Sequence, residues 1–221
     1  TSDVGYLLEQ VPAALAESME GTLRISRIVR AMKEFSHPGG VEKAPADLNR
    51  AIESTVAVAR NEWKYVADLD LNLDSQLPSV MCLIGEINQA VLNLIVNAAH
   101  AIGDALKTRP GHGKGRITIS TRKMGSEVEI RVADTGSGIP ENIQSRIFEP
   151  FFTTKEVGRG TGQGLAMVYT TIVRRHDGSV RFETEPGKGT TFVLRLPIVA
   201  PAKSPTDESP LMHEEKNQSA R

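Results

Sequence analysis

The sequence is poor in the residues that mark secreted, metal-cluster or nucleic-acid-binding proteins. It has one cysteine, Cys82, so neither an intrachain disulfide nor a cysteine-rich zinc site can form. We expect Cys82 to pack as a small apolar residue in a reducing compartment, the cytoplasm. The 26 Lys and Arg are balanced by 27 Asp and Glu. With no surplus of cations, we expect no general binding to nucleic acid.

Long hydrophobic runs are also missing. The longest, at residues 91–96, is interrupted by Asn93 and is far shorter than the roughly 20 apolar residues of a bilayer-spanning helix. We therefore expect no membrane contact by this chain, whether the parent protein is soluble or membrane-anchored. Hydrophobic residues make up 39% of the sequence, which is enough for one full core and an accessory element.

Composition and periodicity divide the chain into three parts. In residues 1–40, apolar side chains recur at spacings of three and four, which predicts a long helix that needs partner helices, as in a bundle. Residues 41–200 contain the remaining periodic segments. Residues 201–221 are rich in Pro, Ser and charge, which predicts a disordered linker or tail.

The middle part mixes helical and strand patterns. Helices are predicted from a cap at Asp47 to residue 63, and at residues 84–106, 141–147 and 164–175. Strands are predicted at residues 66–73, 116–123, 127–133, 179–184 and 190–196, the last four as two hairpins. The fold class is therefore α+β, a two-layer α/β sandwich whose mixed, mainly antiparallel sheet is covered on one face by helices.

Polar side chains interrupt the apolar helix at residues 84–106. Asn93, Asn97 and His100 are spaced by four and three residues, so they project from one side. Polar groups on an apolar helix need hydrogen-bond partners, either a neighbouring backbone or a ligand.

Three later segments are polar and rich in glycine or aromatic residues. Asp134 is followed by Gly136 and Gly138, which suits either an ordinary turn or a backbone that approaches a flat ligand closely. Residues 148–155 place three phenylalanines beside a polar run. Residues 158–165 hold four glycines before a predicted helix, an arrangement that can cradle phosphates, but they match neither the Walker-A nor the dinucleotide pattern.

In this order, the four segments resemble the ATP-binding catalytic domain of sensor histidine kinases, within the superfamily of gyrase, chaperone and mismatch-repair ATPases. The resemblance covers residues 43–199, and residues 187–192 are similar to the closing motif of the family. Residues 30–38 resemble the end of the second helix of the dimerisation and phosphoacceptor hairpin. The resemblance implies a protein-histidine kinase with ATP and Mg²⁺ as cofactors.

The resemblance also implies a role for each matching residue. Asn97 is expected to hold Mg²⁺ with Asn93 beside it, and His100 to contact a phosphate. Asp134 is expected to accept from the adenine amino group, with Gly136 and Gly138 under the ring. Lys155 or Arg159 would reach the γ-phosphate, so the expected catalytic residues are Asn93, Asn97 and Lys155. Further nucleotide contacts are implied for Ile139, Gly160, Thr161, Gly162, Gln163, Gly164, Leu165 and Thr190.

Asn93 favours phosphoryl transfer over hydrolysis. Hydrolysing relatives carry a glutamate at this position, whereas an amide has no useful basicity at neutral pH. Glu86, seven residues earlier, is another carboxylate that could activate water for hydrolysis. We expect transfer from ATP to a histidine of the hairpin and relay to the aspartate of a response-regulator receiver domain. An ATP hydrolase, a serine-protein kinase and a nucleotide-responsive interaction module without chemistry remain alternatives.

None of the five histidines has the sequence context of the family's acceptor, which lies on the first hairpin helix and is followed by Glu or Asp. We expect the acceptor to lie upstream of Thr1 in a longer, homodimeric parent. This chain should then bind Mg·ATP without phosphorylating itself.

Overall fold

The computed structural model describes residues 42–108, 113–154 and 161–199. The helix predicted within residues 1–40 and the tail predicted at 201–221 lie outside these ranges, so both stay predictions. In chain order, the elements are β1 (Ala44–Ala46), α2 (Leu48–Val58), α3 (Arg60–Trp63), β2 (Ala67–Asn72), β3 (Val80–Cys82), α4 (Ile84–Thr108), β4 (Gly115–Met124), β5 (Glu127–Asp134), the 3₁₀ helix η1 (Glu141–Arg146), α5 (Gly164–Tyr169), the π-helix η2 (Thr170–Arg175), β6 (Ser179–Glu185) and β7 (Gly189–Pro197).

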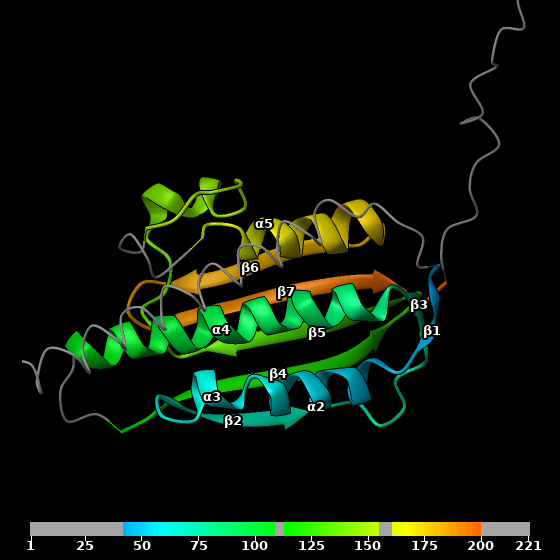
Figure 1. Ribbon diagram of the computed structural model, residues 1–221, viewed down its shortest axis with the longest axis horizontal. Coiled ribbons are helices and arrows are strands. Elements are labelled where there is room, and N and C mark those ends of the chain that lie inside the picture. The colour runs from blue at the N-terminus through cyan, green and yellow to red at the C-terminus, as the bar shows by residue number, and fades with distance from the viewer. Residues whose placement is uncertain (1–41, 109–112, 155–160, 200–221) are drawn as a thin grey trace, which may run out of the picture.

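Five strands form the main sheet in the order β2-β4-β5-β7-β6. The β2–β4 pair is parallel and the other three pairs are antiparallel. The helices α2, α4 and α5 lie over one face of this sheet (Figure 1). The predicted α+β sandwich with a mixed, mainly antiparallel sheet is confirmed.

The longest helix, α4, forms the centre of the helical layer. Its buried side chains, among them Leu94, Ile95 and Ile102, recur at helical spacing and pack on the sheet. On the sheet side, Ile117, Ile119 and side chains of β5 and β7 are fully buried. This packing fixes the position of α4 relative to β5. The polar residues of α4 therefore keep a fixed position relative to the end of that strand.

The first helix in the described ranges begins where its cap predicts. The Asp47 carboxylate accepts from the backbone N–H of Arg50, and Leu48 and Ile52 are buried. The helix predicted to continue to residue 63 is instead interrupted at Ala59, whose N–H bonds back to the carbonyls of Ala57 and Thr55. A separate single turn, α3, follows, so the prediction of one continuous helix is wrong.

A small second sheet was not expected from the sequence. β1 and β3 pair antiparallel, with Ala44 opposite Cys82. Cys82 is 2% exposed, as predicted for a small apolar residue, and burial raises the pKa of its thiol.

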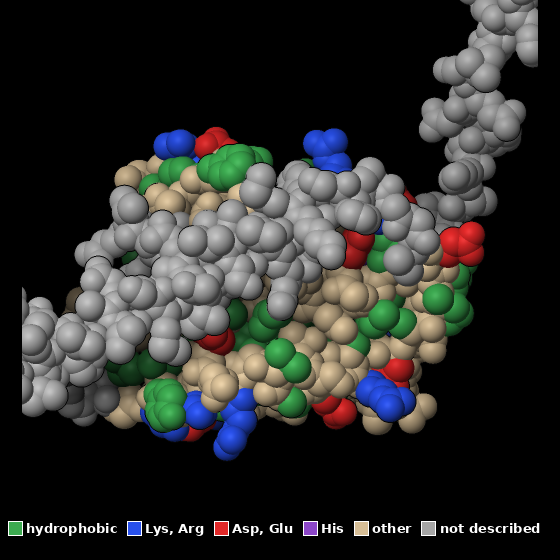
Figure 2. Space-filling view, viewed as in Figure 1, with side chains coloured by type: hydrophobic (Ala, Val, Ile, Leu, Met, Phe, Trp, Pro, Cys, Tyr) green, Lys and Arg blue, Asp and Glu red, His purple; other side chains and the backbone are tan. Residues whose placement is uncertain are grey.

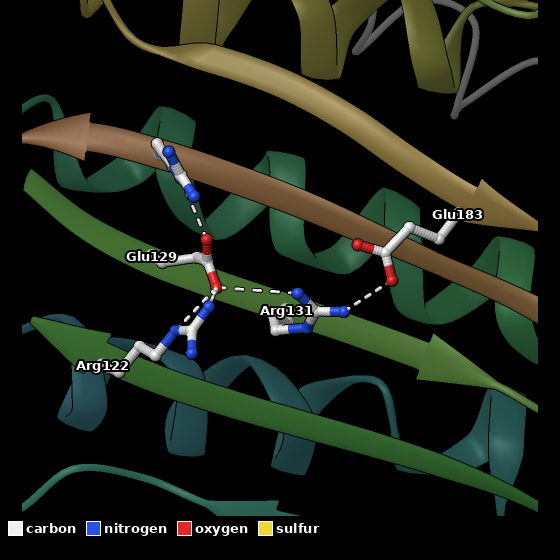
Figure 3. A network of polar contacts seen from close by, with 5 residues as sticks. Arg122, Glu129, Arg131 and Glu183 are labelled. Atoms are coloured by element: carbon white, nitrogen blue, oxygen red, sulfur yellow. Dashed lines mark hydrogen bonds and ion pairs between the residues drawn. The ribbon is translucent and has the colours of Figure 1, made fainter. Parts of the chain in front are cut away.

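The face of the sheet opposite the helices carries an ion-pair cluster. Glu129 of β5 is 1% exposed, and its carboxylate accepts from Arg122 of β4 and Arg195 of β7 (Figure 3). Arg131 lies 3.7 Å away and also binds Glu183. Burial acts to raise the pKa of Glu129, and the hydrogen bonds from the arginines outweigh it and hold the pKa below its usual range.

Charge on the surface is mixed. In the part of the surface that the structure describes and Figure 2 displays, Lys and Arg side chains are scattered among Asp and Glu rather than gathered in one field. This agrees with the formal net charge of −1. Among the described helices, none is both long enough and apolar enough to cross a bilayer.

Candidate nucleotide-binding site

The asparagines of α4 lie against the first residue of α5. Asn93 donates from Nδ2 to the carbonyl oxygen of Gly164 at 3.3 Å. A Cβ built on Gly164 would lie 3.7 Å from Cγ of Asn93 and 3.8 Å from Nδ2 of Asn97. The structure therefore brings together the asparagine segment and the end of the glycine-rich segment, which are about 70 residues apart in the sequence. His100 is half-buried one turn further along α4.

Asp134 is the last residue of β5 and its carboxylate is held by the backbone. Oδ1 accepts from the N–H groups of Gly136 at 2.8 Å and Thr190 at 3.3 Å. Burial raises the pKa of Asp134 to about 6, against the opposing effect of these two hydrogen bonds. Among the described residues both bonds use Oδ1, which leaves Oδ2 as the oxygen for a ligand donor. An orientated carboxylate in a partly desolvated setting fits recognition of an exocyclic amine.

The loop after Asp134 packs directly on α4. Ser137 donates its backbone N–H to the carbonyl of Ala101 at 3.2 Å, and a Cβ on Gly136 would lie 2.6 Å from Cβ of Ala101. Gly138 has φ +71°, and a Cβ there would approach the carbonyl oxygen of Glu185 to 2.4 Å. Packing against the protein itself thus requires both glycines, in addition to any ligand that they would face.

Thr184 is a residue of this site that sequence reasoning missed. Its Oγ1 lies 3.0 Å from Oγ1 of Thr190, which is 6% exposed, and accepts from the N–H of Ile139 at 2.9 Å. The two threonines face each other across the β6–β7 hairpin. Once Thr190 is a candidate, the length of the 185–189 turn would have identified Thr184 as its cross-strand neighbour.

Phe151 and Gly162, which stand on either side of residues 155–160 in the sequence, lie against each other. Gly162 has φ +67°, and a Cβ on it would lie 2.4 Å from the backbone carbonyl carbon of Phe151. Phe151 also has a positive φ, 66°, and its side chain is 71% exposed. Gln163 donates its N–H to Oγ1 of Thr161, which is exposed, and Leu165 is partly buried against the core. Lys155, Arg159 and Gly160 lie outside the described residues, so their predicted contacts are not placed.

Glu86 is engaged in an ion pair. Its Oε1 lies 3.1 Å from the guanidinium of Arg175 at the end of η2. It stands in the first turn of α4, seven residues and about 10 Å of helix before Asn93. Glu86 is therefore paired with Arg175 and lies far from Asn93, the position at which hydrolysing relatives carry the water-activating glutamate.

The donors fit magnesium-bound nucleotide. Within the described residues, no three His, Cys, Asp or Glu side chains gather as a metal site. Magnesium bound to a nucleotide needs few protein ligands, because phosphates and water supply most of its oxygens. Amide oxygens of Asn93 and Asn97, which are hard ligands, suit that role.

Comparison with known proteins agrees with this geometry. Residues 84–200, more than half of the chain, match the family model described as histidine kinase-, DNA gyrase B-, and HSP90-like ATPase. The chain belongs to this family. We refer to residues 42–199, which contain nearly all of the matched range, as the kinase domain.

The curated relatives are sensor kinases. The chain is 35% identical to sensor kinase CckA of Brucella abortus over 87% of its own length, and 32% identical to sensor histidine kinase ZraS of Escherichia coli over 90%. It spans 21% and 42% of these two proteins. The solved catalytic domain of histidine kinase ThkA is 28% identical, with a TM-score of 0.61 over 72% of this chain and 98% of that one.

Proposed function

We propose that the kinase domain transfers the γ-phosphoryl group of Mg·ATP to a histidine on a dimerisation hairpin, from which it passes to the aspartate of a response regulator. The observation that carries this proposal is the pair Asn93 and Asn97 beside Gly164. The pair offers amide groups and no carboxylate at the place where phosphates would lie. Phosphoryl transfer needs positioning and charge neutralisation more than a base, which suits this donor set.

The adenine end is assigned to the other side of the site. Oδ2 of Asp134 would accept from the adenine amino group, with Gly136 and Gly138 below the ring and the Thr184–Thr190 pair at its edge. The backbone bonds to Oδ1 hold the carboxylate in place before the ligand arrives, which reduces the entropy lost on binding.

At the phosphate end, we assign Mg²⁺ to Asn97 with Asn93 beside it. When bound, the ion neutralises and bridges phosphate oxygens. His100 would contact a phosphate, and so would the stretch from Gly160 to Leu165. We assign the γ-phosphate to Lys155 or Arg159, and these two side chains would replace water around it as the lid segment closes.

The relatives support the proposed acceptor and partners. The match to ZraS covers 90% of this chain, which is more than the kinase domain alone, so it supports assigning residues 1–40 to the second helix of a hairpin. A protein with the same fold, ThkA, has been solved in complex with the response regulator TrrA. We therefore propose a receiver domain as the partner, a homodimeric parent protein and a linker at residues 201–221.

A transfer experiment tests the proposal. The 221-residue chain is mixed with labelled Mg·ATP and a separate hairpin that carries a histidine followed by Glu or Asp. The proposal predicts an acid-labile phosphoprotein on the hairpin and no label on the chain itself. Steady phosphate release without transfer would instead identify a hydrolase, and binding with neither reaction would identify an interaction module.

A further inference from the structure

Gln89 is a half-buried residue of α4, one turn before Asn93, to which neither the fold nor the proposed function gives a role. Its Nε2 donates to Oδ1 of Asn93 at 3.3 Å. Asn93 in turn donates from Nδ2 to the carbonyl oxygen of Gly164 at 3.3 Å. Two hydrogen bonds therefore run in series from α4 to the first residue of α5.

The direction of this series is fixed at one end by the backbone. A carbonyl oxygen only accepts, so the end of the Asn93 amide that faces Gly164 must be the NH₂ group. The oxygen of Asn93 then faces Gln89, which must present a donor. A reversed Asn93 amide would place oxygen against the Gly164 carbonyl and NH₂ against the NH₂ of Gln89. The Gly164 carbonyl thus favours one of the two orientations of the Asn93 amide, and the NH₂ group of Gln89, which donates to Oδ1, reinforces it.

The orientation of the amide decides what Asn93 offers to a nucleotide. In the observed orientation, the second N–H of Nδ2 would be available to a phosphate oxygen, and the second lone pair of Oδ1 would be available to a water on the magnesium ion. Reversal exchanges donor and acceptor, so an oxygen would meet a phosphate oxygen. The site therefore needs one orientation, and the two are nearly equal in energy unless neighbours distinguish them.

Gln89 lies on the side of α4 that contacts α5 and η2. Glu86, Gln89, Asn93 and Asn97 follow one another at spacings of three, four and four, so they share one side of α4. Opposite that side, α5 and η2 run from Gly164, beside Asn93, to Arg175, which pairs with Glu86 at 3.1 Å. Along α4, Gln89 lies between these two contacts.

We propose that Gln89 is a positioning residue of the kinase: it holds the Asn93 amide in the orientation that the phosphates of Mg·ATP require. This inference rests on the proposed function for its consequence, but the hydrogen-bond series itself exists without nucleotide. Gln89 acts through Asn93 and needs no contact with the nucleotide.

Two substitutions separate this role from packing. Gln89→Met keeps the length of the side chain and removes the donor, so that only the Gly164 carbonyl still favours the observed orientation of Asn93 and the reversed one becomes more populated. We expect about threefold weaker binding of Mg²⁺ and a non-hydrolysable ATP analogue. Gln89→Glu presents only acceptors, which favours the reversed amide, so the loss should be about tenfold, the factor for roughly one hydrogen bond. Asn88→Asp adds the same charge in the same turn but off this side of the helix, and should change the affinity less than about twofold.

A double-mutant cycle assigns the effect to Asn93. In an Asn93→Ala background, Gln89→Glu should weaken binding by less than about twofold further, because no amide remains to be reversed. An equal tenfold loss in that background would overturn the proposal, since the effect would then be direct repulsion of phosphate. Gln89→Met binding as tightly as the unmodified chain would also overturn it.

A nucleotide-free measurement keeps this inference separate from the proposed function. The side-chain ¹⁵N resonance of Asn93 in the unmodified chain should show one set of NH₂ signals with slow exchange, and Gln89→Met should shift or broaden them. Unchanged signals would overturn the inference even if ATP binds. Changed signals with no ATP binding would sustain the hydrogen-bond series and overturn the proposed function alone.

Discussion

At the scale of single residues, Asp134 carries the clearest conflict between stability and function. Burial raises the pKa of its carboxyl group to about 6, well above 3.8, so the charged form that dominates at pH 7 is less stable in the folded protein than it would be in water. A carboxylate placed for folding alone would have cationic neighbours, as Glu129 has in Arg122 and Arg195. Asp134 has backbone N–H donors instead, which fits a group that is completed by a ligand.

Replacement of Asp134 by Asn should therefore stabilise the protein while it weakens nucleotide binding. The full pKa shift corresponds to roughly 3 kcal/mol, and because the carboxylate still borders solvent we expect a gain of about 1–2 kcal/mol in the free energy of unfolding at pH 8. Binding of an ATP analogue should weaken by about tenfold or more. Urea unfolding and calorimetry measure the two effects. A variant that is less stable and binds normally would show that Asp134 is a structural turn residue.

The same shift predicts a pH dependence. The folded-state pKa of Asp134 exceeds the unfolded-state value, so its contribution to the free energy of unfolding is largest below about pH 4 and declines as pH rises towards 6. Nucleotide affinity should move in the opposite direction and fall as pH drops below about 6, because the protonated group loses its acceptor. Asp134→Asn, titrated with the same analogue, controls for protonation of the nucleotide. Parallel pH profiles for the two proteins would contradict the assignment.

At the scale of the elements, α4 and the α5–η2 segment form one unit tied at three points. Asn93 binds Gly164, Glu86 binds Arg175, and His176, immediately after η2, accepts from the N–H of Leu83, the residue before α4. His176 is 2% exposed; its Nε2 accepts from the N–H of Leu83, so its Nδ1 donates to the carbonyl of Thr171. These contacts fix the position of Gly164 relative to the axis of α4.

His176 should make the domain sensitive to acid. Burial lowers the pKa of its imidazole, helped by Lys43 and Arg175, so the folded state favours the neutral ring. Its contribution to the free energy of unfolding is complete above about pH 6.5 and is lost as pH falls. His176→Phe should cost about 2–3 kcal/mol at pH 7.5, since the Leu83 N–H loses its acceptor, and should reduce the acid sensitivity. Chemical denaturation at pH 7.5 and 5.5 tests this; an unchanged difference between the two pH values would contradict it.

The Glu86–Arg175 pair separates kinase from hydrolase. Glu86→Gln keeps the shape of the side chain and removes its charge, and because the pair is partly exposed we expect a loss of less than about 1 kcal/mol in stability. Phosphate release should stay at background, and transfer to a hairpin should remain within about twofold of the unmodified chain. Arg175→Met is the matched control for the ion pair. Abolition of a measurable ATPase activity by Glu86→Gln, but not by Arg175→Met, would identify Glu86 as a base.

At the scale of the whole molecule, the sequence predicted the elements whose periodicity and termini are local. The helix at Ile84–Thr108 and the two hairpins were found because alternation and turn residues define them within a few positions. The break at Ala59 and the β1–β3 pair were missed, since neither Gly nor Pro marks the first and three-residue strands have no period. Both depend on contacts with the rest of the chain.

The residues of the candidate site likewise divide into those that the sequence predicted and those that it missed. Asn93, Asn97, Asp134 and Thr190 were predicted as site residues from motifs, and the structure places Asn93 beside Gly164 and Asp134 beside Thr190. Thr184, Gln89 and Arg175 were missed because their roles come from partners across a hairpin or between helices. Family motifs predict which groups would touch the nucleotide, and the structure adds the groups that contact those predicted residues.

The central claim is that Mg·ATP binds between α4 and the two glycine-containing loops. Calorimetric titration of the folded 221-residue chain with a non-hydrolysable ATP analogue, with and without Mg²⁺, tests it most directly. We predict binding of about −5 to −8 kcal/mol that requires Mg²⁺, and loss of this requirement in Asn97→Ala. Absence of heat and of thermal stabilisation in a chain whose circular dichroism shows it to be folded would contradict the account.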